Sequence, residues 1–171
     1  MNRRSIIGLS AIMALGFALL PASAVAQQKS VKEQLVGTWT LVSFDSFDAS
    51  GAKVPNMEGR DVKGLLILTG NGRWSFQIIT EIPKLASNDR LKSMPAEDKA
   101  VAHGVLSNFG TYTVNEADKT LSVRFERSSF PNQLTGADAK RVATFTGDEL
   151  KLDNPGRMAG GKTVTVWRRA K

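Results

Sequence analysis

The chain has 171 residues, with 23 lysines and arginines, 16 aspartates and glutamates, one histidine and no cysteine. Its net charge of +7 favours anionic ligands or surfaces, but the basic residues are scattered, which argues against a nucleic-acid partner. The absence of cysteine excludes disulfides, thiol catalysis and metal–thiolate sites, and one histidine alone does not build a metal centre, so we expect no metal and no cofactor.

The first 26 residues have the pattern of a cleaved signal peptide. Arg3 and Arg4 precede an apolar run at 6–20, and Ala24-Val25-Ala26 fits a signal peptidase site. The apolar run is short for a membrane span, so we expect no stable membrane anchor. The expected product is one domain of residues 27–171 that is periplasmic or secreted. The arginine pair also fits a twin-arginine signal, so two export routes remain open.

After this segment, short apolar runs alternate with turns, which is typical of antiparallel β-structure. A helix-like segment at 31–35 comes first. Strands are then expected at 37–47, 62–69 and 73–82, with a long polar loop at 45–61 that would overhang the open mouth of a barrel. The turn Gly70-Asn71-Gly72 predicts a hairpin, because glycine and asparagine tolerate positive φ.

The pattern changes to helical spacing between residues 95 and 108. Val101, Val105 and Phe109 recur on one face, and Pro95 suits the first turn of a helix. Gly110 is expected to end this inserted helix.

Five further strands follow the helix. They are expected at 111–114, 120–127, 139–146, 149–153 and 162–169. The predicted fold is therefore all-β: an eight-stranded up-and-down antiparallel β-barrel with one inserted helix, since closure removes the exposed sheet edges.

The two ends of the domain carry matching signals for a closed barrel. Gly37 and Trp39 open the first strand, and Trp167-Arg168-Arg169 closes the last. In a closed barrel these strands are neighbours, so one guanidinium, Arg169 or Arg168, would lie over the Trp39 indole and plug the base. Ligand contact by Trp39 is the alternative.

These motifs in order resemble the lipocalin-like domain proteins of the calycin superfamily. The resemblance rests on 35–39, 70–73, 95–100 with 109–114, 130–132 with Gly136 and Arg141, 147–152 and 167–169. It implies an exported bacterial member with the barrel fold. Members of this family often carry histidine on the strand equivalent to 121–126, and this chain has none there.

Four aromatic residues and one arginine are the candidate ligand-binding residues: Trp74, Phe76, Tyr112, Phe125 and Arg141. The aromatic side chains would either line a cavity or fill the barrel, since barrels of eight strands do both. Alternation places Trp74, Phe76 and Ile78 on one face, without saying which face points inward. Arg141 would anchor a carboxylate through paired N–H donors. Its alternative is an outward charge, as for Arg124 and Glu126.

No catalytic residue is assigned from the sequence. His103 groups with Lys99 on the polar side of the predicted helix, and no nucleophile–base set accompanies it. The expected function is binding of a small, mostly apolar or amphiphilic ligand inside the barrel. A barrel-type isomerase or cyclase, which would need a pair of inward-facing ionisable residues, and a structural envelope protein with a filled barrel remain alternatives. The oligomeric state is left open.

Overall fold

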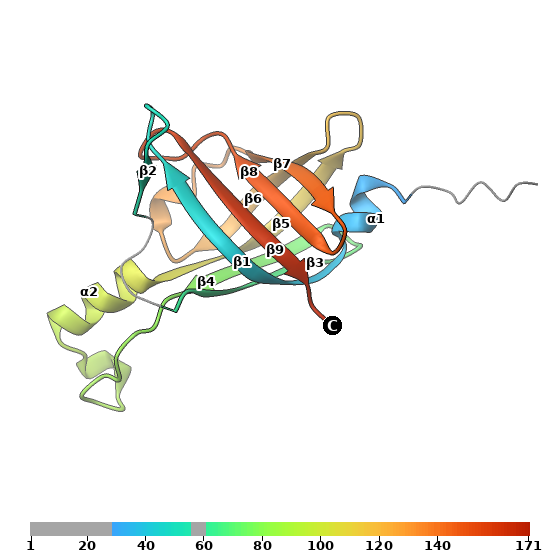
Figure 1. Cartoon of the computed structure of the whole chain (residues 1–171). Helices are drawn as coiled ribbons and strands as arrows, with labels where there is room; N and C mark the ends of the chain where they lie inside the picture. The colour runs from blue at the N-terminus through green and yellow to red at the C-terminus, as the bar shows by residue number, and fades with distance from the viewer. Residues whose placement is uncertain (1–28, 56–60) are drawn as a thin grey trace, which may run out of the picture.

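The computed structural model describes residues 29–55 and 61–171 (Figure 1). The predicted signal peptide lies outside these residues. The helices are α1 (Val31–Leu35) and α2 (Pro95–Gly104), with 3₁₀ turns at Arg90–Lys92 and Pro131–Gln133. The strands are β1 (Gly37–Phe47), β2 (Lys53–Val54), β3 (Lys63–Leu68), β4 (Arg73–Ile79), β5 (Val105–Asn115), β6 (Thr120–Ser128), β7 (Ala139–Thr146), β8 (Glu149–Asn154) and β9 (Lys162–Arg169).

The strands form a closed antiparallel barrel, as predicted. The described strands pair in the order β2-β1-β3-β4-β5-β6-β7-β8-β9, and β1 also pairs with β9 to close the ring. The main ring is up-and-down, because each strand from β3 onward pairs with the next along the chain. The short β2 is an addition to the eight expected strands: Lys53 and Val54 pair with the end of β1, so part of the predicted 45–61 loop is a hairpin.

The predicted helix at 95–108 is four residues too long. Helix α2 ends at Gly104, and β5 begins at Val105. Val105 and Phe109 were expected on a helix face, but they pair in register with Ile79 and Ser75 of β4. Pairing with β4 satisfies a row of backbone groups, and β-branched and aromatic residues suit such a strand, so sheet formation outweighs the helical spacing. Figure 1 shows α2 projecting from the barrel end opposite α1.

A β-bulge changes which side chains of β1 point inward. Leu41 pairs with Trp167 and Ser43 with Val166, so Val42 is an extra residue and is 48% exposed. Strict alternation along β1 would place Leu41 and Ser43 on one face. The bulge reverses the alternation beyond it, so that Phe44 and Ser46, rather than Ser43, face the interior.

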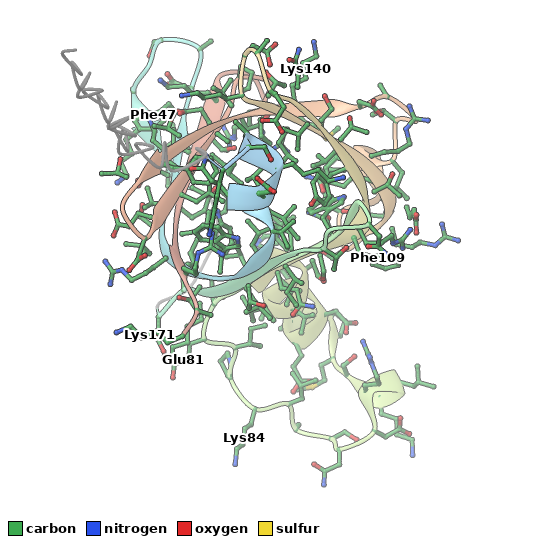
Figure 2. The ribbon with its side chains drawn as sticks, turned by 90° about the vertical axis from the view of Figure 1, so that its right-hand side faces the viewer. Phe47, Glu81, Lys84, Phe109, Lys140 and Lys171 are labelled. Carbon is green, nitrogen blue, oxygen red and sulfur yellow. The ribbon has the colours of Figure 1, made fainter. Side chains whose placement is uncertain are left out.

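Helix α1 closes one end of the barrel. It lies across the ring in the end-on view of Figure 2. The Glu116 carboxylate on the β5–β6 turn accepts hydrogen bonds from the backbone N–H groups of Val31 (2.6 Å) and Lys32 (3.0 Å), which are otherwise unsatisfied at a helix start. Ser30 and Glu33 complete a capping box. The local capping box and the Glu116 carboxylate of the barrel turn therefore both hold the start of α1 at this end of the barrel.

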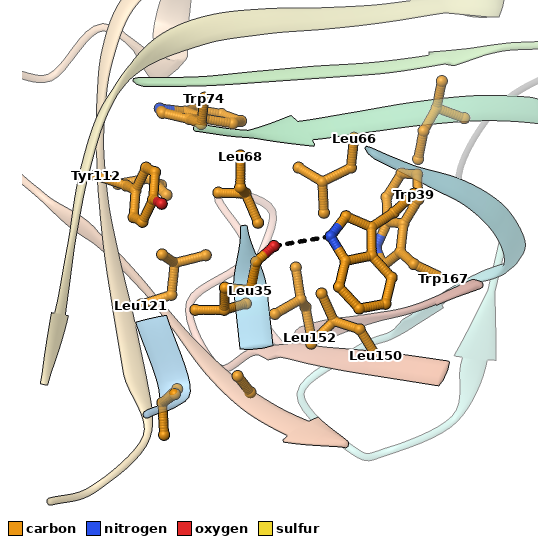
Figure 3. Packing of buried hydrophobic residues seen from close by; sticks show 14 residues of the cluster. Leu35, Trp39, Leu66, Leu68, Trp74, Tyr112, Leu121, Leu150, Leu152 and Trp167 are labelled. Carbon is orange, nitrogen blue, oxygen red and sulfur yellow. Dashed lines mark hydrogen bonds between the residues drawn. The ribbon is translucent and has the colours of Figure 1, made fainter. Parts of the chain in front are cut away.

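The base of the barrel is packed solid around Trp39. Its indole is 1% exposed, and its Nε1 donates to the Leu35 carbonyl at 2.9 Å (Figure 3). The Arg169 guanidinium lies over the ring, with Cζ 4.1 Å from its centroid, and donates to the carbonyls of Val36 (3.0 Å) and Gln34 (2.6 Å). Arg168 points outward and pairs with Glu149, as alternation requires.

Gly37 makes room for this arrangement. Its φ of +140° disfavours other residues, and a Cβ there would lie 2.6 Å from Nη1 of Arg169. The glycine of the Gly-x-Trp motif therefore leaves the space that Arg169 needs to reach the base of the barrel.

Candidate functional site

A cavity of about 720 Å³ occupies the barrel end opposite α1. Its deep wall consists of inward side chains of the strands, including Leu66, Leu121, Val123 and Leu152. Its rim consists of the start of β5 with α2, the β6–β7 loop and the β8–β9 loop. The barrel is therefore filled at its base and hollow above it, and the volume lies in the range of small-molecule sites.

Three of the four predicted aromatic residues meet in the cavity wall. The Trp74 ring lies edge-on to Phe125, with centroids 5.4 Å apart, and to Phe76 at 6.3 Å. Phe76 in turn contacts Trp167 of the base at 5.5 Å. These edge-to-face contacts hold the rings rigid, so the apolar wall is preformed.

Tyr112 does not belong with them. Its side chain is buried in the packed base, outside the cavity lining, and its hydroxyl donates to the Thr69 carbonyl at 2.7 Å. Burial raises the pKa of this hydroxyl. Tyr112 lies two inward positions closer to the base than Asn108 on β5, and this offset along the barrel axis is invisible to strand alternation.

Arg141 lines the cavity, and burial shifts the pKa of its guanidinium. Its Nη1 donates to the Lys140 carbonyl and to Oδ1 of Asn154, both at 2.8 Å. Within the described part of the chain, its Nε and Nη2 make no hydrogen bond and no carboxylate forms an ion pair with it. Burial lowers the pKa of Arg141 to about 10. The guanidinium is therefore charged at neutral pH, with no counter-ion among the residues that the structure describes.

The acidic residue of the cavity lining, Asp138, has another partner. Asp138 accepts from Nε of Arg124 at 2.8 Å, and both side chains are substantially exposed. The other ionisable residues of the lining, His103, Lys140 and Arg157, lie on α2, at the start of β7 and on the β8–β9 loop. His103 is exposed, as expected, but it contributes to the rim. The isomerase or cyclase alternative would need a pair of ionisable residues deep in the barrel. Among the described residues no such pair lines the deep part of the cavity.

A polar arc extends from Arg141 over three further strands. Asn154 on β8 accepts from Arg141 and donates through Nδ2 to Thr163 on β9 at 3.1 Å. Thr163 is paired in register with Ser46 on β1. We call Arg141, Asn154, Thr163 and Ser46 the polar arc. Sequence reasoning missed all but Arg141. Cross-strand register brings them together, and the Val42 bulge is required for Ser46 to join them.

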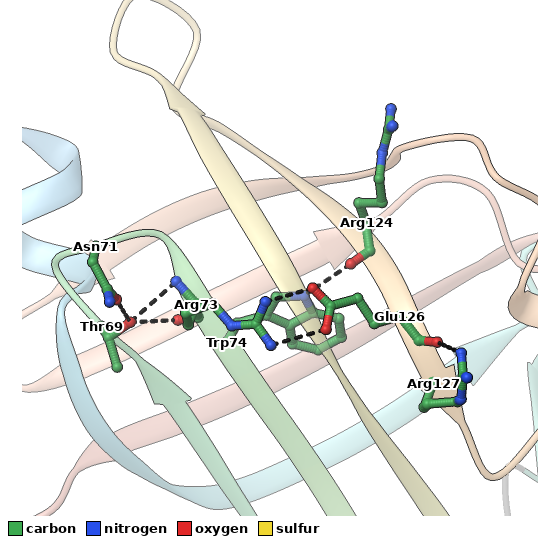
Figure 4. Close-up of polar contacts among 7 residues, drawn as sticks. All are labelled: Thr69, Asn71, Arg73, Trp74, Arg124, Glu126 and Arg127. Carbon is green, nitrogen blue, oxygen red and sulfur yellow. Dashed lines mark hydrogen bonds and ion pairs between the residues drawn. The ribbon is translucent and has the colours of Figure 1, made fainter.

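Glu126 and Arg124 are on the outer surface, the ordinary position for charges in a strand. Glu126 forms a two-point ion pair with Arg73 of β4, one contact being Nη2 to Oε2 at 2.9 Å (Figure 4). Glu126 is the extra residue of a bulge, since Gly110 pairs with Phe125 and Phe109 with Arg127. This bulge lets its side chain reach past β5 to Arg73. The Arg73 hydrogen bond lowers the pKa of Glu126.

Metal-ligand clusters and membrane-spanning helices are both absent from the described residues. No group of three metal-ligating side chains occurs there. No helix of residues 29–55 and 61–171 is both long and apolar enough to cross a membrane.

Comparison with known proteins identifies a family and a solved structure to which the chain is similar. The sequence model of a lipocalin-like domain matches residues 36–170. A search of curated proteins finds no match. Among solved structures, the chain is similar to fatty-acid-binding protein 1 of Echinococcus granulosus, with 16% identity over 81% of this chain and 99% of that one, and a TM-score of 0.38.

Proposed function

The chain belongs to the lipocalin-like domain family, and we propose that it binds one small amphiphile inside the barrel. The apolar body of the ligand lies against Trp74, Phe76 and Phe125, and its anionic head pairs with Arg141. The observation that carries the proposal is the guanidinium of Arg141, which faces a largely apolar cavity and has no carboxylate partner among residues 29–55 and 61–171.

The charge chemistry favours a carboxylate or a similar planar anion. A guanidinium presents paired N–H donors that match the two oxygens of a carboxylate. Nη1 is already held by Lys140 and Asn154, which fixes the plane of the group, while Nε and Nη2 have donors to offer. A partly desolvated cation gains more from an anion than an exposed one, because water screens the pair less.

A fluorescence titration tests the proposal directly. The delipidated protein is titrated with a C16 fatty acid, and we expect saturable binding of one molecule per chain with a change in tryptophan emission. Trp74 is the tryptophan in the cavity lining, so Trp74→Phe should abolish most of the emission change while calorimetry still detects binding. Absence of binding by both methods, with the protein folded by circular dichroism, would contradict the proposed function.

We further propose that the protein acts after export, in the periplasm or outside the cell. The signal-peptide pattern of residues 1–26 supports this, and so does a cysteine-free domain with no thiol to oxidise. N-terminal sequencing of the protein from its native cells should begin at Gln27. A chain that retains Met1 and remains in the cytosol would contradict export.

A further inference from the structure

Two buried polar atoms on the cavity wall have no hydrogen-bond partner within the described part of the chain. They are Oδ1 of Asn108, a residue 4% exposed, and Oγ of Ser46, which is 1% exposed. Both residues line the cavity. Buried polar groups are nearly always paired, so each such atom calls for an explanation.

Asn108 has apolar neighbours on its β4 side, while its register partner on β6 is Ser128, whose hydroxyl donates to Gln133 at 2.9 Å. Phe76 pairs with it directly on β4, and the next inward position of β5 toward the mouth is Leu106. An apolar side chain of similar size would satisfy this position without loss, whereas a buried amide with no partner costs stability. Its presence is understood if the amide meets a polar group inside the cavity.

Ser46 faces the same cavity from the other side. It ends the polar arc, whose hydrogen bonds run from Arg141 through Asn154 to Thr163 and stop before Ser46. The sheet order places β1 and β5 on either side of β3 and β4, so the two polar atoms lie on different walls. Leu66 and Phe76, on these intervening strands, are apolar parts of the lining.

Arg141 and Asn108 are also separated by apolar wall. Strand β6 runs between β5 and β7, and its inward residues Leu121, Val123 and Phe125 all line the cavity. A ligand that reaches both residues thus passes over apolar surface between them. The wall therefore presents an anion site at Arg141, then apolar surface, then an uncharged polar site at Asn108. This order matches an amphiphile that carries a second polar group away from its head.

We propose that the ligand carries a hydroxyl group on its apolar body and that Asn108 binds this hydroxyl. The inference rests on the proposed function and adds the class of ligand: a hydroxylated long-chain acid. A hydroxyl suits the site because it both donates and accepts. It can donate to Oδ1 of Asn108, and it can equally accept from Nδ2 if the amide is turned over. A site built to bond a hydroxyl rejects the analogue that lacks it, because the amide is then left unpaired.

The test compares hexadecanoic acid with a series of its monohydroxy positional isomers, using calorimetry on the delipidated full-length mature chain. We expect at least one isomer to bind about tenfold more tightly than hexadecanoic acid. Asn108→Leu should remove this preference and leave hexadecanoic acid bound at least as tightly as in the wild type. Asn108→Val, which suits a strand, is a second variant in case the leucine packs poorly. Neither should lower the melting temperature, because the amide has no partner in the described structure.

Thr111→Val is the matched control, since Thr111 lies on the same strand with an exposed side chain. It should keep the isomer preference. Equal binding of hexadecanoic acid and all isomers would overturn the inference and leave the proposed function standing, with water at Asn108. A preference that survives Asn108→Leu and Asn108→Val would also overturn it. Absence of binding by every acid would refute the proposed function itself.

Discussion

Replacing Arg141 with glutamine should weaken the binding of hexadecanoic acid by about 100-fold, or about 2.8 kcal/mol. The guanidinium has no carboxylate partner within the described residues, so the ligand head group would be its counter-ion. The variant removes this charge and keeps a polar, shorter amide side chain at the same position. Binding of hexadecanol, which has the same chain without the charge, should change little. Isothermal titration of both ligands measures the difference.

The pH dependence of wild-type binding has a defined sign. An anion beside Arg141 raises the pKa of the guanidinium in the complex above the value of about 10 in the empty protein. The affinity for the acid is therefore full below the pKa of Arg141 in the empty protein. It falls as the pH rises from about 10 toward the higher pKa of Arg141 in the complex. Arg141→Gln should show no such fall beyond the one it shares with hexadecanol.

Arg124→Gln serves as the matched charge control. Arg124 is an exposed arginine on the neighbouring strand β6 and does not line the cavity. Its partner Asp138 is a lining residue, but the carboxylate is exposed and screened by water, so loss of Arg124 should leave the affinity within twofold of the wild type. Equal losses for Arg124→Gln and Arg141→Gln, or equal losses for acid and alcohol, would contradict a specific anion contact at Arg141.

Replacing Trp39 with alanine should lower the free energy of unfolding by about 3–5 kcal/mol. The substitution removes one of the two buried tryptophans of the solid base and leaves a cavity among Leu35, Leu66 and Trp167. It also removes the ring beneath Arg169 and the donor to the Leu35 carbonyl. Urea denaturation followed by far-ultraviolet circular dichroism measures this change without depending on tryptophan emission.

Trp39→Phe separates the contribution of ring packing from that of the hydrogen bond to the Leu35 carbonyl. Phenylalanine keeps a ring beneath Arg169 but has no donor for Leu35, so it should cost clearly less than alanine. Because Trp39 does not line the cavity, folded Trp39→Phe should bind hexadecanoic acid as the wild type does. An unchanged urea midpoint for Trp39→Ala would refute the role of Trp39 as a base plug.

The barrel could be predicted from the sequence because its strands are short, amphipathic and bounded by turn residues. The bounds of 37–47, 139–146 and 162–169 agree with the structure to the residue. The end of α2 could not be predicted, because Val105 and Phe109 have apolar spacing that suits a helix and side chains that suit a strand. Pairing with β4 decides between them, and that is a tertiary effect.

The cavity was harder to predict than the barrel. Alternation correctly groups Trp74 with Phe76, but it does not tell how far along the barrel axis a residue lies, and this is why Tyr112 was misplaced. The bulge at Val42 reverses alternation in β1 and turns Ser46 inward, and no residue type at 42 announces it. Asn108 was hidden because it fell at the end of the predicted helix.

We propose that the hollow half of the barrel holds an acidic amphiphile. Mass spectrometry of an organic extract of the protein, purified from its native compartment without detergent, tests this most directly. We predict one long-chain acid in a ratio near one per chain, and its loss from Arg141→Gln purified in the same way. Protein recovered folded with no organic acid bound, or with the same amount bound to Arg141→Gln, would contradict the claim.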